Sequence, residues 1–473
     1  MKNLALFFYL GVSICFSQTS MPSFFSDNMI LQQEEKVAIW GTDLPGRIIE
    51  IHTSWGIEKS IKTALDGKWY TKIQTNKASF EKQEIKVNGS STVVLKNILI
   101  GEVWFCSGQS NMEMPMKGLG KSPVNNAKEL ISTSQNSFIR LFNSERSASM
   151  SLEDDVLGTW EEAKQKSVEN FSAVGYLFAR KLFKELQIPI GVLEASWGGT
   201  RIESWLPKKS IEKFTAIKIP KTLSEEQRKQ KQPTFLYNAM IHPFKNYAIK
   251  GFLWYQGESN RTNAKPYKEY MHTLVNSWRD QWQQNLPFYF VQIAPYAYQE
   301  FRKTPVIYAN LIRETQSLAA KEIPNTGVVV TTDVGKCTDI HPPEKNKIAN
   351  RLANWALVKQ YKFKDIPYRS PQYKSIKVKR HKIIVAFDFF DKNKKNRSFD
   401  GDRELKNFVI AGEDHVFYPA NVKINKNQTL TVFSEMVKNP VAVRYGFEDC
   451  LEGSLFSKSG LPVSPFRSDI WEE

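Results

Sequence analysis

The sequence predicts an α/β protein: a parallel sheet covered by helices on both faces, with β-rich segments before and after it. Two observations support this fold class. Apolar strands alternate with amphipathic helices between about residues 101 and 365, as in parallel sheets covered on both sides. Short runs of alternating polar and apolar residues occupy the regions on either side. The chain has 473 residues, 41% of them hydrophobic, which is enough for two or three domains.

The first 17 residues are predicted to be a cleaved signal peptide. A basic start, "MKN", precedes an apolar stretch of 13 residues, "LALFFYLGVSICF", and a polar exit, "SQTS". About 20 apolar residues are needed to span a bilayer, so an anchor is disfavoured. A lipoprotein attached through Cys15 is the alternative, but Ile14 is bulky where a small residue is expected. We therefore expect secretion or a periplasmic location, with no stable membrane insertion.

Residues 18–100 are predicted to form a small antiparallel β-domain. Alternating runs such as "KVAIWG", "RIIEIHTSW" and "KWYTKIQT" are separated by the turn signals "DLPG", "LDGK" and "NGSS". A period of two, broken by Gly, Asp, Asn and Pro, is typical of short strands joined by turns.

Residues 101–365 are predicted to form the catalytic domain. The expected strands are "EVWFC", "IGVLEAS", "GFLWYQ", "PFYFVQI" and "TGVVVTT". Helical spacing of apolar residues appears in 171–187, 267–278 and 346–361 between or after them. Ligands of such sheets bind at the carboxyl ends of the strands, so functional side chains are expected directly after these runs.

Residues 366–473 return to the alternating β pattern and form the predicted C-terminal β-rich segment. Once the signal is removed, Cys106, Cys337 and Cys450 remain. At most one disulfide is then possible, with one thiol left over. The sequence does not indicate which cysteines pair.

A serine follows the first strand of the catalytic domain in "CSGQSNMEMP", where Ser110 stands between amide and small residues. A serine after a strand is usually only a turn residue, and the G-x-S-x-G elbow is absent because position 112 is Met. Acyl transfer, however, needs a hydroxyl beside a base and a set of oxyanion donors. The other strand ends decide between these interpretations.

His341 is the predicted base. It lies two residues after Asp339, and in an extended segment residues i and i+2 project to the same side. Asp339 is therefore expected to accept from one imidazole nitrogen and leave the other for Ser110. Asp333 and Glu258 are the rival acids.

The remaining strand ends supply candidate donors and substrate contacts. Gly198-Gly199, in "SWGGTRIESW", removes side chains where a backbone N–H must reach an oxyanion. Gln256, in "QGESN", offers a side-chain amide. Glu258 is a candidate either to support the catalytic groups from behind or to act as an alternative acidic partner. Arg201 is a candidate contact for a substrate carboxylate or carbonyl, although an arginine after a glycine pair more often forms a structural ion pair.

Several other functions are disfavoured. The net charge of +16 is compatible with nucleic-acid binding, but the basic stretches contain no recognised nucleic-acid motif. The stretch "GLGKS" is not a phosphate loop, because Pro115 stands where that loop needs Gly. No Cys/His cluster or H-E-x-x-H motif indicates a metal. The oligomeric state stays open.

Together, "GQSNMEMP", "SWGGTRIESW", "WYQGESN" and "DIHP" closely resemble the motifs of the sialate O-acetylesterase family, a branch of the SGNH-type hydrolases. The resemblance extends to "MPSFFSDNMILQQ" at the start and "GLPVSPFRSD" at the end. It implies a flavodoxin-like three-layer α/β/α domain that removes O-acetyl groups from sugars without a metal or cofactor.

The resemblance also implies roles for individual residues. Ser110 would be the nucleophile, His341 the base and Asp339 its orienting acid. Gly199 and Gln256 would join the Ser110 backbone N–H in the oxyanion hole, and Asn111 would help to hold the turn. The wider superfamily usually has Gly-Asp-Ser at the nucleophile and an Asn as the side-chain oxyanion donor. This chain departs from that pattern, with Gly-Gln-Ser at the nucleophile and Gln256 as the donor. The expected substrate is 9-O-acetylated sialic acid; acetylated xylan or another polysaccharide is the alternative, and a non-catalytic carbohydrate-binding protein is the competing class.

Overall fold

A seven-stranded arrangement forms the centre of the molecule in the computed structural model, which describes residues 18–472 apart from 223–227, 303–308 and 391–395. The predicted signal peptide therefore lies outside the described residues. The strand order is β13-β12-β11-β7-β10-β8-β9, and neighbours pair in parallel except β8 and β9. The strands are β7 (Thr92–Gly108), β8 (Asn136–Ser144), β9 (Gly158–Ala163), β10 (Ile190–Ser196), β11 (Gly251–Tyr255), β12 (Phe288–Val291) and β13 (Thr326–Val329).

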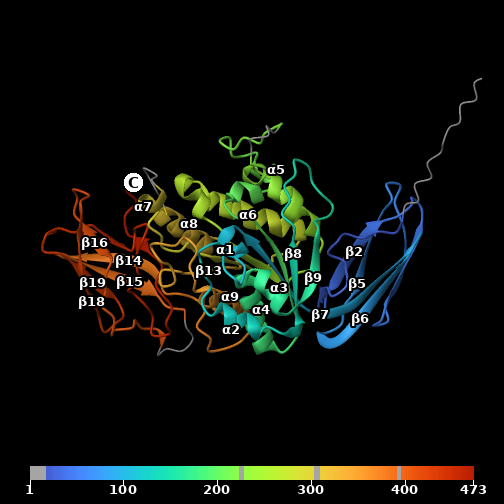
Figure 1. Cartoon of the computed structure of the whole chain (residues 1–473). Helices are drawn as coiled ribbons and strands as arrows, with labels where there is room; N and C mark the ends of the chain where they lie inside the picture. Colours follow the sequence, from blue (N-terminus) through green and yellow to red (C-terminus); the bar gives the residue numbers. More distant parts are fainter. Residues whose placement is uncertain (1–17, 223–227, 303–308, 391–395, 473) are drawn as a thin grey trace, which may run out of the picture.

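Helices cover both faces of this sheet, as the alternation of patterns predicts (Figure 1). Neighbouring residues of β7 point to opposite faces: Trp104 packs in one core cluster and Phe105 in the other. The first face is covered by α4 (Ala173–Leu186) and α9 (Lys345–Lys359), which contribute apolar residues to the Trp104 cluster. The second is covered by α6 (Tyr267–Trp282) and α8 (Ala309–Glu322). The result is the predicted three-layer α/β/α architecture.

The connections contain short helical segments, several of which follow the carboxyl ends of the strands. They are α1 (Ser110–Glu113), α2 (Ala127–Ser132), α3 (Gln165–Asn170), η1 (Ile202–Trp205), α5 (Lys208–Ile211), η2 (Lys229–Lys231), η3 (Tyr237–Ile241), η4 (His242–Phe244), η5 (Glu258–Asn263) and α7 (Tyr298–Arg302).

The N-terminal strands are joined to the central sheet through β7, which continues across residue 100 without a break. Its first half pairs antiparallel with β6, and its second half lies in the parallel sheet. The other N-terminal strands are β1 (Ile30–Gln32), β2 (Lys36–Thr42), β3 (Ile48–Thr53), β4 (Glu58–Lys62), β5 (Lys68–Gln74) and β6 (Ser79–Asn88).

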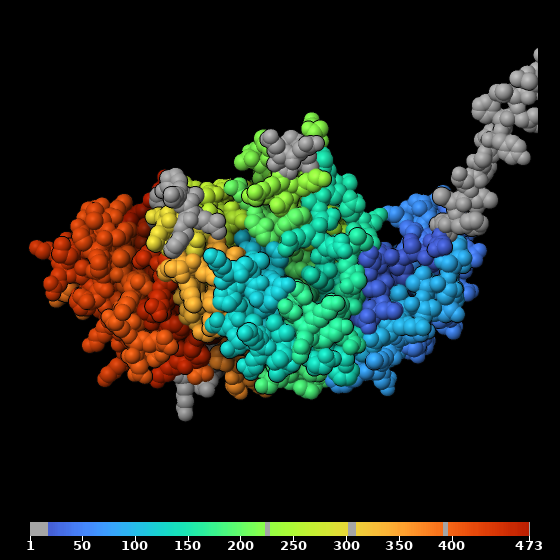
Figure 2. All heavy atoms as spheres, in the orientation of Figure 1, coloured from blue at the N-terminus to red at the C-terminus, as the bar shows by residue number. Residues whose placement is uncertain are grey.

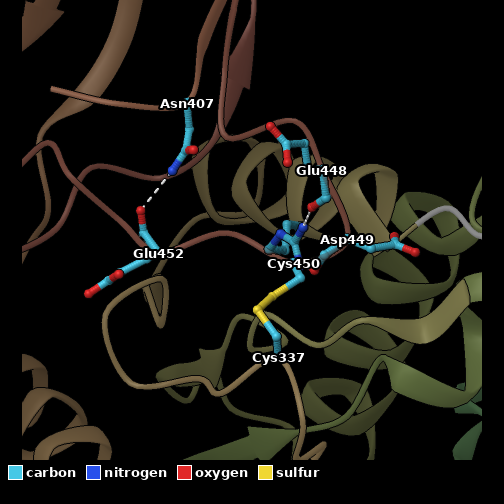
Figure 3. The surroundings of a disulfide bond; sticks show 7 residues. Cys337, Asn407, Glu448, Asp449, Cys450 and Glu452 are labelled. Carbon is cyan, nitrogen blue, oxygen red and sulfur yellow. Dashed lines mark hydrogen bonds between the residues drawn. A yellow bond between two sulfur atoms is a disulfide. The ribbon is translucent and has the colours of Figure 1, made fainter. Parts of the chain in front are cut away.

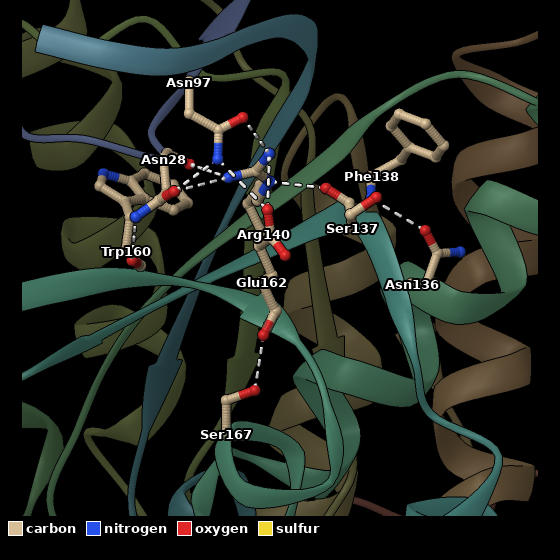
Figure 4. A network of polar contacts seen from close by, with 9 residues as sticks. All are labelled: Asn28, Asn97, Asn136, Ser137, Phe138, Arg140, Trp160, Glu162 and Ser167. Atoms are coloured by element: carbon tan, nitrogen blue, oxygen red, sulfur yellow. Dashed lines mark hydrogen bonds and ion pairs between the residues drawn. The ribbon is translucent and has the colours of Figure 1, made fainter. Parts of the chain in front are cut away.

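A buried arginine on β8 strengthens this junction (Figure 4). Arg140 is fully buried and donates to the side-chain oxygens of Asn28 (3.2 Å) and Asn97 (3.1 Å) and to the backbone oxygen of Ser137 (2.7 Å). Its guanidinium also lies 3.4 Å from the carboxylate of Glu162. Because a buried charge is costly unless it is paired, these contacts tie the N-terminal strands firmly to the central sheet.

The C-terminal segment forms two antiparallel four-stranded sheets around a core of its own. The first sheet contains β14 (Gln372–Lys379), β15 (Lys382–Asp388), β19 (Leu430–Phe433) and β18 (Asn421–Ile424). The second contains β17 (Phe417–Pro419), β16 (Phe408–Ala411), β20 (Ala442–Tyr445) and β21 (Phe466–Arg467). Both sheets contribute to one apolar cluster, and in Figures 1 and 2 this segment lies at the opposite end of the molecule from the N-terminal strands.

The C-terminal segment is fastened to the loop that follows β13 (Figure 3). Cys337 and Cys450 form a disulfide, which settles the pairing that the sequence leaves open, and Cys106 is a buried free thiol. The backbone N–H of Gly453 donates to the oxygen of Thr332 at 3.0 Å. Fully buried Arg313, on α8, donates to the backbone oxygen of Glu448.

Candidate active site

Three adjacent strands end at the same level, and each is followed by one of the predicted motifs. In the register of the sheet, Gly108 at the end of β7 lies beside Ser196 of β10 and Tyr255 of β11. Gly108 has a φ of 145°, and a Cβ there would lie 2.2 Å from the oxygen of Tyr255. Only glycine fits this close approach. The chain then turns directly into α1, which places Ser110 at its first residue, half-buried at the edge of the sheet.

The loop after β13 brings a histidine to this serine. Nε2 of His341 and Oγ of Ser110 lie 3.0 Å apart, within hydrogen-bonding distance. The two residues are 231 positions apart in the sequence. Their contact therefore depends on the parallel sheet bringing the ends of β7 and β13 to one edge.

Asp339 lies beside the histidine, in a turn rather than in the extended segment that the spacing argument assumes. Its Oδ1 atom is 3.9 Å from Nδ1 of His341, an ion-pair distance rather than a hydrogen bond. The same oxygen accepts from the backbone N–H of His341 (2.9 Å) and from Oγ of Ser122 (2.8 Å). The turn is closed by a hydrogen bond from the Asp339 N–H to the oxygen of Lys336. The carboxylate thus holds the backbone of the histidine in place.

The rival acid Asp333 is bound elsewhere. Its two carboxylate oxygens accept from Arg351 at 2.7 and 2.8 Å, and Lys347 lies 3.2 Å away. Although burial raises the pKa of Asp333, its bonds to Arg351 outweigh that effect and lower the pKa overall. The carboxylate of Asp333 is therefore engaged in an ion pair with Arg351 on α9.

The glycine pair after β10 lies against Ser110 and is held by a residue that the sequence analysis missed. Oε2 of Glu113 accepts from the N–H of Gly198 at 2.7 Å, and the other carboxylate oxygen pairs with Arg146. A Cβ at Gly198 would lie 3.3 Å from the Cβ of Ser110. Gly199 has a φ of 72° and open space where a side chain would start. The sequence could have indicated Glu113, because it lies three residues after Ser110 and residues i and i+3 share a helix face.

Gln256 is buried and makes contacts with the surrounding loops. Its Nε2 donates to the oxygen of Thr200 (3.1 Å) and to Oδ1 of Asn260 (2.8 Å), and its Oε1 accepts from the hydroxyl of Tyr267 (2.9 Å). Its amide thus joins the loops after β10 and β11. Arg201, in the loop after β10, is exposed directly before η1.

Behind the serine and histidine lies a buried polar network. Asn111 donates to Oε1 of Glu258 (2.6 Å) and to the oxygen of Ile340 (3.1 Å), and its Oδ1 accepts from Nζ of Lys345 (2.6 Å). Burial lowers the pKa of Lys345 to about 7 and raises the pKa of Glu258. The sequence analysis missed Lys345, although its position four residues after His341 at the start of a helix was a usable signal.

A buried acid on β10 gives a testable dependence of stability on pH. Burial raises the pKa of Glu194 from 4.5 to about 8, although the hydroxyl of Ser196 donates to its carboxylate. Between these two values the folded chain holds a proton that the unfolded chain loses, so this residue makes stability fall as pH rises. We expect Glu194→Gln to raise the melting temperature relative to the original chain more at about pH 8.5 than at about pH 5.5. An equal difference at both pH values would contradict this assignment.

The described residues contain no group of three His, Cys, Asp or Glu side chains placed to hold a metal ion. Within the same residues, no helix is both long and apolar enough to cross a membrane.

A serine hydroxyl paired with a histidine at the carboxyl edge of a three-layer α/β/α domain defines a serine hydrolase. Residues 100–357 match the family model described as carbohydrate esterase, sialic acid-specific acetylesterase. The chain belongs to this family, and it is a carbohydrate esterase that removes O-acetyl groups.

Similar proteins agree with this assignment. The sialate O-acetylesterase of Homo sapiens is 29% identical over 500 residues, covering 95% of this chain and 92% of that protein. The sialate O-acetylesterase of Mus musculus is 27% identical over 526 residues, covering 95% and 94%. The crystal structure of a carbohydrate acetylesterase from Xanthomonas citri has a TM-score of 0.86 and 30% identity, and the match covers 96% of this chain and all of that one.

Proposed function

We propose that Ser110, His341 and Asp339 carry out the deacetylation. The observation that carries this proposal is the 3.0 Å separation of Ser110 Oγ and His341 Nε2. Oγ attacks the acetyl carbonyl carbon while Nε2 takes its proton. The tetrahedral intermediate then collapses, the bond to the sugar oxygen breaks, and the imidazolium returns the proton to that oxygen. Water, deprotonated by His341, then attacks the acetyl-enzyme carbonyl. The second intermediate collapses with cleavage of the bond to Oγ, the imidazolium returns the proton to Oγ, and acetate is released.

Asp339 has the role of stabilising the imidazolium that forms in each step. Its Oδ1 lies 3.9 Å from Nδ1, and it already fixes the backbone of the histidine. A shortening of this contact when His341 becomes positively charged would stabilise the charge most in the transition state.

The oxyanion is assigned to the backbone N–H groups of Ser110 and Gly199, together with Gln256. Ser110 is the first residue of α1, so its N–H has no acceptor within the helix. The hydrogen bond from Gly198 to Glu113 supports the position of the next N–H, that of Gly199. Gln256 can contribute only by exchanging its bond to Thr200 or Asn260 for one to the substrate.

We assign 9-O-acetylated sialic acid as the substrate, with acetylated xylan or another polysaccharide as the alternative. Two relatives are named sialate O-acetylesterases, which supports the first, and the similar Xanthomonas citri enzyme is described only as a carbohydrate acetylesterase. A sialic acid carries a carboxylate, and exposed Arg201 beside the glycine loop can pair with it. The net charge of +16 would also attract an anion at low salt.

A substrate panel tests this assignment. We expect kcat/KM to be highest for 9-O-acetylsialic acid among that sugar, acetylated xylo-oligosaccharides and an aryl acetate. Arg201→Ala should lower the sialate value by roughly tenfold, the loss of one charge-assisted contact, and leave the aryl acetate unchanged. Exposed Lys208→Ala is the matched control for loss of one positive charge. Preference for xylan, or an equal loss on all three esters, would overturn the sialate assignment or the role of Arg201.

We further propose export after removal of residues 1–17, and three units at 18–100, 101–365 and 366–473. The disulfide between Cys337 and Cys450 supports export, because such bonds persist mainly in oxidising compartments. The separate apolar cluster of the C-terminal sheets supports the last unit. The first two proposed units share strand β7 and one apolar cluster.

A further inference from the structure

A cavity of about 610 Å³ lies between the N-terminal strands and the central domain, formed by residues other than those of the triad. One side is the two-stranded sheet β2–β5, and the other includes Asp154 and Asp155 from the loop between β8 and β9. In Figure 2 the N-terminal residues, in blue, lie directly against this part of the central domain, in teal. The size is within the range of small-molecule sites.

The floor of this cavity carries two aromatic side chains next to each other. Trp40 and Tyr70 are directly paired across β2 and β5, and Thr42 and Lys68 are the next pair on the same face. Tyr70 is 48% exposed, which is unusual for so large a ring. The Trp40 ring is held edge-on against Phe25, with centroids 4.7 Å apart. The Trp40 ring is thus held in place by Phe25, and the exposed Tyr70 ring beside it is suited to stacking against the C–H face of a sugar ring.

The walls of the cavity are polar and balanced in charge. Its lining includes three carboxylates and three ammonium groups, from Asp66, Asp154, Asp155, Lys62, Lys68 and Lys245. Lys68 and Asp154 form an ion pair at 2.7 Å, and the hydroxyls of Ser20 and Thr42 lie 2.7 Å apart. Such walls disfavour a lipid, which offers no hydrogen bonds, and a strongly charged ligand, which meets no net field. A neutral ligand rich in hydroxyl groups fits both the floor and the walls.

The same loop that forms one wall also contacts α1, the helix that begins at Ser110. Arg146 pairs with Glu113, which lies on α1 with Ser110, and Asp154 is eight residues further along the loop. Eight residues span at most roughly 26–29 Å, so the cavity is no further than that from Arg146. The loop thus connects one wall of the cavity to α1, the helix that begins at Ser110.

We infer that this cavity is a second saccharide-binding site, which holds a neutral pyranose unit of the glycan whose acetyl group is removed at Ser110. The inference rests on the proposed function for the identity of the glycan. The Tyr70 ring would stack on the sugar, and the carboxylates and hydroxyls of the walls would accept and donate hydrogen bonds to its hydroxyl groups.

The test separates binding from catalysis. In a Ser110→Ala background, an array of neutral and acidic oligosaccharides is screened, and the affinity of the bound neutral members is measured by calorimetric titration. Adding Tyr70→Ala should weaken that binding by roughly two- to tenfold, the contribution of one aromatic contact, while Tyr70→Phe keeps it. Phe80→Ala is the matched control, since Phe80 is a comparably exposed ring of the same region (44%) that does not line the cavity. Unchanged melting temperatures would verify the fold of each variant.

Failure of this inference is distinguishable from failure of the proposed function. With Ser110 present, turnover of an aryl acetate reports the catalytic chemistry alone, and Tyr70→Ala should leave it unchanged. If no neutral oligosaccharide binds, or if Tyr70→Ala binds as tightly as Phe80→Ala, the second site is refuted whatever the turnover. If the second site is refuted but the Ser110→Ala variant has lost aryl acetate turnover, the catalytic proposal still stands.

Discussion

Ser110→Ala is expected to lower kcat for an aryl acetate by roughly 10³–10⁶-fold, the range seen when the nucleophile of a serine hydrolase is removed. The alanine lacks the Oγ atom that lies 3.0 Å from Nε2 of His341, so no acetyl-enzyme can form. Folding should be unaffected, because Ser110 is only half-buried and the change is small. Acetate release in single-turnover and steady-state assays measures the effect.

A matched control distinguishes this loss from a general effect of removing a hydroxyl. Ser132→Ala, on α2 in the same domain, removes an exposed hydroxyl that donates to the backbone oxygen of Glu129. It should retain full activity. If Ser110→Ala retains full turnover as well, the assignment of the nucleophile is wrong. If the original chain binds acetylated sugars but releases no acetate from any of them, the competing class of a binding protein is favoured.

Asp339→Asn is expected to lower kcat by roughly 10²–10⁴-fold with little change in KM. An asparagine can still hold the backbone of His341, but it cannot stabilise the imidazolium that forms beside it at Nδ1. Glu258→Gln is the comparison. The carboxylate of Glu258 contacts Asn111, so its neutral analogue should reduce kcat much less. A large loss in Glu258→Gln together with a small one in Asp339→Asn would show that the wrong acid was chosen.

The sequence predicts those parts of this site that follow from local pattern. Alternating strands and helices indicate a parallel sheet. Its topology explains why Ser110, Gly198-Gly199 and Gln256 closely follow strands, and why His341 lies in the loop after another strand of the same sheet. The fold class was therefore predictable from periodicity and from the motifs. The contact between Ser110 and His341 could be expected, because both follow strands of one sheet, but its distance could not.

Contacts that depend on long-range packing were not predictable from the sequence. Arg146 reaches Glu113 because the start of the loop between β8 and β9 lies beside α1 in the folded protein. Lys345 is buried beside Asn111, whereas a lysine at a helix start is ordinarily exposed. The spacing of Asp339 and His341 suggested an extended segment, yet a turn places the carboxylate on the histidine backbone. In each case tertiary contacts, and not local preference, set the side-chain position.

The loop after β13 is anchored by residues that are synthesised much later than the loop itself. This loop carries both Asp339 and His341, and its partner Cys450 is 113 residues beyond Cys337. A second contact, from Gly453 to Thr332, comes from the same late part of the chain. A ribosome has therefore synthesised Ser110, the whole parallel sheet and α9 long before the loop that bears the base gains its anchor. The loop that bears the base therefore gains its C-terminal anchors only after Cys450 and Gly453 have been synthesised, when its contacts with Ser122 and Asn111 can already form.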